Sequence, residues 1–430
     1  MDSATTGRLL LAALLLTMLG TAPASALAWR TETVDSAGDV GYYTSLALDG
    51  AGTPRIGYYD GSARALKYAW YDGAGWQNET IESTMGVSGG PSLALDAAGT
   101  PRLSYLDGDN VDLMYAWRDG SGWHLETVDS AGNVGYGNSL ALDGAGNPRV
   151  SYSAGTPKAL KFAWHDGAGW QNETVALTDR PPEFTSLALD AAGNPCIGYR
   201  DNSEYDLKYA WRDGGTWRVE TVDAAGDVGY DTSLALDGAG APRISYVDWT
   251  NQDLKYAWRD GTGWHTETVD PDGGRFTSLA VDGAGTPRLS YLDSSSKDLK
   301  YAWRDGAGWH IETVDSAGEV GLHSSLALDG VGNPCISYLD GSNGDLKYAW
   351  AVITPPGVTA VPGGPVLPTD TDGDGLCDDV NGNGRADFAD VVLFFNQMAW
   401  IAENEPLEAF DYNGNGRIDF ADVVWLFNNL

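Results

Sequence analysis

Two twelve-residue runs near the C-terminus carry oxygen-bearing side chains at the same five positions. In the first run, positions 1, 3, 5, 9 and 12 are Asp379, Asn381, Asn383, Asp387 and Asp390. In the second run, 32 residues further on, they are Asp411, Asn413, Asn415, Asp419 and Asp422. Position 6 is glycine in both runs, and the backbone carbonyl at position 7, of Arg385 or Arg417, adds another oxygen. Calcium takes about six to eight hard oxygen ligands, so the pattern predicts two Ca2+ sites.

An apolar stripe with helical spacing follows each run. The stripes are Phe388, Val391, Val392 and Phe395 after the first run, and Phe420, Val423, Val424 and Phe427 after the second. Apolar residues at i, i+3, i+4 and i+7 predict an amphipathic helix. We expect the two stripes to pack together, and neither run has a clear helix before it.

Paired calcium loops with aspartate at position 12, each followed by a helix, resemble the dockerin family. The resemblance covers about residues 370–430 and implies calcium as cofactor and an extracellular partner, in that family a cohesin domain, often in complexes that degrade polysaccharides. Many dockerins have Ser-Thr at loop positions 10 and 11, where this chain has Phe388-Ala389 and Phe420-Ala421. Upstream, the acidic run from Asp370 to Asp374 resembles the calcium loops of thrombospondin-type repeats. It either holds a further ion or is a hydrated linker.

A segment similar to Ser-Leu-Ala-Leu-Asp occurs seven times, and the residues just before it form a second candidate site. These residues differ between the copies and include aromatic and polar side chains, at Tyr42, Tyr43, Tyr136, Glu183, Phe184, Tyr230, Asp231, Arg275, Phe276 and His323. Aromatic faces interleaved with polar groups suit sugar or peptide binding, and we expect these residues to bind a ligand. Tyr205 and Trp249 lie in neighbouring loops. The alternative is that the aromatic side chains only pack these loops.

A repeated unit must position these residues, and seven copies of it fill residues 29–350. One tryptophan series recurs at Trp29, Trp76, Trp123, Trp170, Trp217, Trp264 and Trp309. Each copy contains four short strand-like segments separated by Gly, Asp, Asn and Pro, without helical periodicity. Four antiparallel strands in about 45–50 residues are typical of one propeller blade. The sequence therefore predicts an all-β, seven-bladed β-propeller, followed by a small α-helical calcium-binding domain.

The phase of the repeat predicts a closed ring. The repeat region begins with a Trp-x-x-Glu-Thr-Val strand at Trp29 and ends with a Leu-Lys-Tyr-Ala-Trp strand at Trp350. The first strand can therefore complete the last blade and remove two sheet edges. Residues that recur in each blade, such as Asp49, Arg55 and Glu32, are expected to be scaffold. Cys196 and Cys335 occupy one repeat position nearly opposite each other, too far apart for a disulfide.

Paired carboxylates favour a second function. Glu183 and Asp231 could face each other from adjacent blades, as a glycoside hydrolase requires of its two carboxylates. The alternative function is thus a polysaccharide-active enzyme, a hydrolase, sialidase-like or lyase-like propeller targeted by its dockerin. A third is a purely structural surface protein.

Charge and targeting restrict the partners. The chain has 26 basic and 60 acidic residues, a net charge of −34, which disfavours nucleic acid and anionic lipid as partners. Residues 1–28 resemble a secretory signal, with Arg8, an apolar run too short to span a membrane, and small residues before a cleavage site. The alternative is an anchor that is not cleaved. Asn78 and Asn172 lie in glycosylation sequons.

These patterns predict four parts: a signal peptide (1–28), a propeller (29–350), a Pro/Gly linker (351–369) and a dockerin-like domain (370–430). The favoured function is a secreted, calcium-binding attachment protein without a membrane span. Its propeller would bind a glycan or protein, and its tail would dock to a cohesin-like or other extracellular protein. The protein itself would be extracellular or associated with the cell surface.

Overall fold

The computed structural model describes residues 26–83, 87–271, 273–330, 332–354, 358–364, 366–371 and 376–429. The predicted signal peptide up to residue 25, and most of the acidic run from Asp370 to Asp374, lie outside them. The chain divides into one compact unit at Trp29–Ala351 and a second that contains Val352–Leu430. No helix in the described ranges has the length and apolar character needed to cross a membrane.

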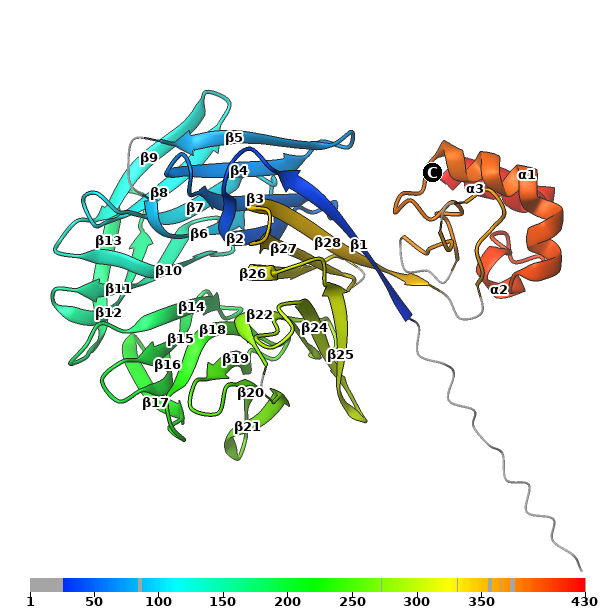
Figure 1. Ribbon diagram of the computed structural model, residues 1–430. Coiled ribbons are helices and arrows are strands. Elements are labelled where there is room, and N and C mark those ends of the chain that lie inside the picture. Colours follow the sequence, from blue (N-terminus) through cyan, green and yellow to red (C-terminus); the bar gives the residue numbers. More distant parts are fainter. Residues whose placement is uncertain are drawn as a thin grey trace, which may run out of the picture. The chain divides into compact units, whose positions relative to one another are not determined.

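The first unit is a ring of seven four-stranded antiparallel blades (Figure 1). The innermost strands are β2 (Val40–Leu48), β6 (Val87–Leu95), β10 (Val134–Leu142), β14 (Glu183–Leu189), β18 (Val228–Leu236), β22 (Arg275–Val281) and β26 (Val320–Leu328). The second strands are β3 (Pro54–Asp60), β7 (Pro101–Asp107), β11 (Pro148–Gly155), β15 (Pro195–Asp201), β19 (Pro242–Asp248), β23 (Pro287–Leu292) and β27 (Pro334–Asp340). The third strands are β4 (Ala65–Tyr71), β8 (Asp112–Asp119), β12 (Lys158–His165), β16 (Asp206–Asp213), β20 (Asp253–Asp260), β24 (Leu299–Asp305) and β28 (Asp345–Thr354). The outer strands are β5 (Trp76–Glu82), β9 (Gly122–Asp129), β13 (Trp170–Leu177), β17 (Thr216–Asp223), β21 (Gly263–Asp270), β25 (Gly308–Asp315) and β1 (Ala26–Asp35).

The N-terminal strand closes the ring, as the phase of the repeat predicted. Strand β1 pairs with β28 in a sheet of order β1-β28-β27-β26, so the last blade combines both ends of the repeat region (Figure 1). Each blade therefore has four strands, and the two edges that an open array would expose are paired.

A ring of hydrogen bonds joins the innermost strands of neighbouring blades. In each blade the first leucine of the Ser-Leu-Ala-Leu segment, or its equivalent, donates its backbone N–H to a serine hydroxyl of the preceding blade, at 2.9–3.0 Å. The seven accepting serines are Ser45, Ser92, Ser139, Ser186, Ser233, Ser278 and Ser325. The bond from Leu46 to Ser325 Oγ, at 3.0 Å, links the first blade to the last.

A second ring of bonds explains the recurring glutamate. Each tryptophan at the start of an outer strand donates its indole N–H to a glutamate of the preceding blade, at 2.6–3.0 Å. Trp29 and Glu312 make this contact across the ring closure. The recurring turn aspartate is also scaffold, since Asp49 accepts from the backbone N–H of Ala51 and Thr53 and from Arg55.

The second unit contains α1 (Phe388–Asn404), the four-residue helix α2 (Leu407–Phe410) and α3 (Phe420–Asn429). Its core includes Phe394, Phe410, Tyr412 and Leu426, all nearly or fully buried. Val358 and Val361 belong to the same core, so part of the segment expected to be a linker packs within this unit. The three cysteines are buried free thiols, which agrees with the expected separation of Cys196 from Cys335.

Removing one acceptor from the ring of serines should weaken the propeller. Ser325→Ala leaves the backbone N–H of Leu46 unpaired, and we expect the free energy of unfolding to fall by about 1–2 kcal/mol, the cost of an unsatisfied, largely buried donor. Equilibrium denaturation measures this change. Ser121→Ala, in an exposed turn of the same propeller, is the control. Equal stability of the two variants would contradict the role assigned to Ser325.

Candidate functional site

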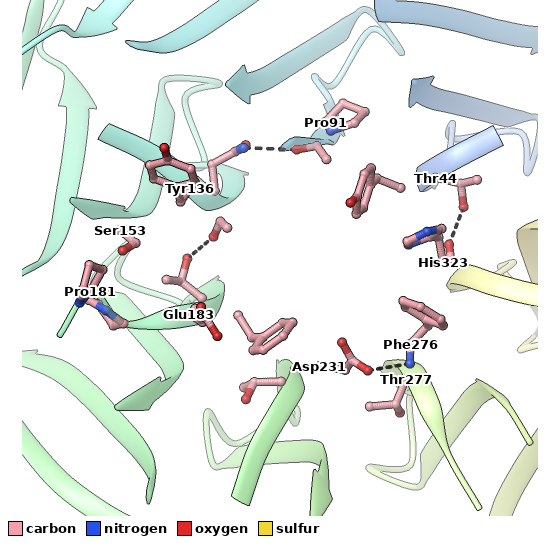
Figure 2. A pocket seen from close by; sticks show the side chains of 18 of the residues that line it. Thr44, Pro91, Tyr136, Ser153, Pro181, Glu183, Asp231, Phe276, Thr277 and His323 are labelled. Carbon is pink, nitrogen blue, oxygen red and sulfur yellow. Dashed lines mark hydrogen bonds between the residues drawn. The ribbon is translucent and has the colours of Figure 1, made fainter. Parts of the chain in front are cut away.

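The innermost strands surround a cavity of about 930 Å³ at one mouth of the central channel (Figure 2). All seven blades contribute lining residues. Seven of the ten predicted ligand residues line it: Tyr43, Tyr136, Glu183, Phe184, Asp231, Phe276 and His323. Tyr42, Tyr230 and Arg275 do not. Tyr42 instead packs against Tyr59 and donates its hydroxyl to Asp39 at 2.9 Å.

In five blades a residue with a left-handed backbone directs its side chain at this cavity, and in another blade the equivalent residue is glycine. Tyr43, Gly137, Phe184, Asp231, Phe276 and His323 are equivalent and have φ between 50° and 54°. In this left-handed region a residue with a Cβ costs about 1–2 kcal/mol, and such strain is most often kept at functional sites. The neighbouring blade holds the conformation in place. Thr44 Oγ1 donates to the carbonyl of His323 at 2.9 Å, and Ser324 Oγ donates to that of Phe276 at 2.9 Å.

His323 lies between two aromatic rings of the cavity. Its ring centroid is 4.3 Å from that of Tyr43 and 4.4 Å from that of Phe276. Burial lowers the pKa of His323 to about 4. The imidazole is therefore neutral at neutral pH, and this side of the cavity is an uncharged aromatic surface with one polar edge.

Two carboxylates also line the cavity, Asp231 beside Phe276 and Glu183 further round the ring. Asp231 Oδ2 accepts from the backbone N–H of Phe276 at 2.7 Å (Figure 2), and burial raises the pKa of Asp231. The Glu183 side chain is about half exposed (52%), with Oε2 3.7 Å from Arg200 Nη1. The structure thus places the two predicted carboxylates on one cavity. They can accept hydrogen bonds from ligand hydroxyls, and their different surroundings also suit acid and base roles.

We number the blades along the chain from the one that begins with β2. Blade 4 (β14 to β17) departs from the repeat beside Glu183, at Arg200, a residue that the sequence analysis did not single out. Arg200 is only 2% exposed. The equivalent positions hold Tyr59, Leu106, Ser153, Val247, Leu292 and Leu339. Arg200 Nη2 donates to Asp227 at 2.6 Å and to the Tyr230 hydroxyl at 3.1 Å. An arginine where most copies are apolar was the available signal. A buried charge costs stability unless it is well paired, which favours a functional reason for it.

The two candidate calcium loops fold as turns around their acidic residues. Asp379 accepts from the backbone N–H of Asn383 and Gly384, and Asp390 accepts from those of Asn381 and Asp387. The second loop repeats this arrangement.

The residues of these loops fit calcium. Asp379, Asp390 and Asp422 are fully buried, and within the described residues none of them pairs with lysine or arginine. Burial is the main cause that raises the pKa of Asp390 to about 7. No group of three or more Asp, Glu, His or Cys side chains converges on one point in the described part of the chain. Because the loops would supply Asn side chains and a backbone carbonyl besides Asp, such a group is not required.

The two helical stripes pack against each other, but most of their side chains stay exposed. Val391 and Val423 are buried, with Phe394 and Leu426. The rest of each stripe stays between 42% and 63% exposed, and comprises Phe388, Val392, Phe395, Phe420, Val424 and Phe427. We call these six residues the apolar face. Ring contacts between Phe388 and Phe427, and between Phe395 and Phe420, join its two halves.

Comparison with known proteins identifies one family and one fold. The family described as dockerin type I domain matches residues 377–430. No curated protein matches the chain. A polysaccharide lyase described as a PL25 ulvan lyase bound to -[GlcA(1-4)Rha3S]- is 14% identical and has a TM-score of 0.50, covering 75% of this chain and 96% of its own. A protein of unknown function from Dyadobacter fermentans DSM 18053 is 12% identical, with a TM-score of 0.45, covering 66% and 97%. At these identities, the likeness shows the fold alone.

The depressed pKa of His323 predicts a pH dependence of stability. Below an ordinary histidine pKa of about 6.5 the unfolded chain binds a proton that the folded chain binds only near pH 4, so this residue destabilises the fold progressively over that range. Phe occupies the equivalent position in blades 4 and 6. We expect His323→Phe to lose less thermal stability than the unmodified protein between pH 7 and pH 4.5. His165→Gln, on β12, is the control. If the melting temperatures of His323→Phe and of the unmodified protein fell in parallel as the pH is lowered, the expectation would be wrong.

Proposed function

We propose that this chain, whose residues 377–430 match the dockerin type I domain, is a secreted attachment protein that docks by its C-terminal unit and binds a glycan on its propeller. The observation that carries the proposal is the cavity at the channel mouth, built where the seven copies differ. Its aromatic faces and hydrogen-bond acceptors suit a carbohydrate, whose rings are apolar on their faces and carry hydroxyls around their edges.

Calcium is the proposed cofactor of the C-terminal unit. Asp379, Asn381, Asn383, Asp387 and Asp390, with the Arg385 carbonyl, would hold one ion. Asp411, Asn413, Asn415, Asp419 and Asp422, with the Arg417 carbonyl, would hold the other. Bound calcium would neutralise carboxylates that the fold buries without a basic partner. It would thereby stabilise a unit with a small apolar core.

The apolar face is the proposed docking surface. Large apolar side chains that stay exposed on a small soluble unit usually mark a binding site. A cohesin-type domain on an extracellular protein is the partner class that a dockerin implies. Phe-Ala at the two positions often occupied by Ser-Thr indicates a more apolar contact than those dockerins make, and hence a distinct choice of partner.

The first experiment tests docking. The whole chain is titrated against a panel of cohesin domains, with calcium and with a chelator, beside the double variant Phe395→Ser/Phe427→Ser. We expect calcium-dependent binding to at least one cohesin, and at least about a tenfold loss of affinity in the variant, because exposed aromatic anchors dominate such interfaces.

Leu407→Ser is the matched control for this experiment. It removes a similarly exposed apolar side chain (42%) from α2, outside the apolar face. An equal loss in this control would argue against the apolar face as the docking surface. Binding that survives the chelator would contradict the role of calcium.

The second experiment tests the propeller by glycan-array binding of the whole chain and of Tyr43→Gly. Glycine suits the left-handed backbone, as Gly137 does in blade 3, so the variant removes the ring without adding strain. We expect loss of at least about tenfold in affinity for the glycan that binds best. Leu177→Ala, an exposed change on outer strand β13, should bind normally.

The carboxylates on the cavity keep a polysaccharide-active enzyme as a second candidate function. The same incubations are therefore assayed for shortened glycan chains, with Glu183→Gln beside the unmodified protein. Cleavage that the variant lacks would replace attachment by catalysis as the function of the propeller.

A further inference from the structure

Three arginines gather on one sector of the propeller, in a chain with 26 basic residues against 60 acidic ones. Arg180 precedes β14 of blade 4, Arg200 lies on β15 of the same blade, and Arg275 begins β22 of blade 6. Tyr230 on β18 and Trp249 after β19 belong to blade 5, which lies between them.

The arginines and three aromatic rings form one continuous stack. The Arg180 guanidinium lies 5.6 Å from the Tyr205 ring centroid. The Arg200 guanidinium lies 5.2 Å from the same centroid and 4.1 Å from that of Tyr230. Tyr230 contacts Trp249 at 5.1 Å between centroids, and Arg275 lies 4.4 Å from the Trp249 ring. We call these six residues the arginine strip.

This arrangement is particular to the sector. The Trp249 position holds Gly61, Gly108, Gly155, Asn202, Ser294 and Gly341 in the other copies. At Gly61 and Gly341 an added Cβ would lie 3.1 Å from Tyr42 Cε2 and 2.5 Å from Leu322 Cδ1, so a side chain there would require these neighbours to move. In blade 5, Tyr230 occupies the position of Tyr42 and Leu322, and its ring packs against Trp249. Trp249 in turn contacts the Arg275 guanidinium.

The outer two arginines make no close ion pair in the described part of the chain, although the charge of Arg275 acts on Asp231 and lowers its pKa against the effect of burial. Among the described residues, neither Arg180 nor Arg275 forms an ion pair within 4.0 Å, whereas Arg200 pairs with Asp227 and lies near Glu183. Arg180 donates instead to the Tyr205 hydroxyl at 2.5 Å. Tyr205 and Trp249 are exposed, at 39% and 38%. The rings hold both guanidinium groups in set orientations, which lowers the entropy lost when an anion binds.

We propose that the arginine strip binds the acidic groups of an anionic polysaccharide, carboxylate or sulfate. This rests on the proposed glycan function and specifies its ligand class. A planar guanidinium matches both oxyanions with paired hydrogen bonds. Glu183 and Asp231, on the adjoining cavity, accept from hydroxyls, which every sugar unit supplies. An acidic peptide would instead bring its carboxylates against these two residues.

The strip acts at short range, because the net charge of −34 repels a polyanion at a distance. At about 0.15 M salt the screening length is about 8 Å, so binding there reports the local contacts. The experiment is therefore done at that ionic strength.

The test measures affinity of the whole chain for polygalacturonate, dextran sulfate and unsulfated dextran. The variant is Arg180→Gln/Arg275→Gln. We expect one acidic polymer or both to bind, and the variant to lose at least about tenfold in affinity for it, since each charged hydrogen bond contributes about that factor. Arg64→Gln is the control, an exposed arginine in blade 1 at the position of Tyr205. Unchanged thermal unfolding of all variants is required, and Arg275→Lys should recover only part of the affinity.

Several outcomes would overturn this inference. One is that neither acidic polymer binds. A second is that an acidic polymer binds the double variant as tightly as it binds the unmodified protein. Another is that poly-glutamate binds as tightly and with the same arginine dependence, which would assign the strip to acidic peptides. Binding of a neutral glycan alone, lost in Tyr43→Gly, would leave the proposed glycan function standing and reject only the anionic ligand class. If no glycan of either kind binds, both proposals fail.

Discussion

Each innermost strand is a sheet edge, and its exposed backbone groups must be paired before seven sheets can form a ring. The ring of serines meets this requirement, since each hydroxyl accepts an N–H from the next blade. The same contacts set the spacing between neighbouring inner strands. The left-handed residues precede these serines by two positions, and the carbonyls of Gly137, Phe276 and His323 accept from hydroxyls of the neighbouring blade. The shape of the cavity therefore depends on the bonds that close the ring.

A ring held by repeated bonds can change in one sector without losing its scaffold. The tryptophan–glutamate and serine contacts are complete in blades 4 to 6, although their rim residues differ from the rest. Arg200 is the clearest change within such a sector. It brings a charge into an interior position that is leucine or valine in four other copies, and its pairing with Asp227 and Tyr230 offsets part of the desolvation cost. Glu183 and Tyr230 lie beside it, and Trp249 packs on Tyr230.

In the C-terminal unit, the apolar residues of each helix are divided between a buried core and an exposed surface. Val391 and Phe394 are buried, while Phe388 and Phe395, one turn away in each direction, remain exposed. A unit of this size cannot bury every apolar residue and still keep a binding surface. Calcium, proposed for the two loops, would supply the stabilisation that the smaller core lacks.

The sequence alone determined those features that repeat or that are local. The tryptophan spacing predicted seven blades, the phase predicted closure by the first strand, and the loop spacing identified the dockerin-like domain, because each depends on neighbours along the chain. Tertiary structure decided which side chains at the channel mouth face the cavity. Phe276 and His323 face it with a left-handed backbone that the next blade holds, whereas Tyr230 and Arg275 pack on Trp249. The grouping of Arg180, Arg200 and Arg275, like the exposed part of each helical stripe, depends on contacts between segments far apart in sequence. No single repeat encodes such contacts.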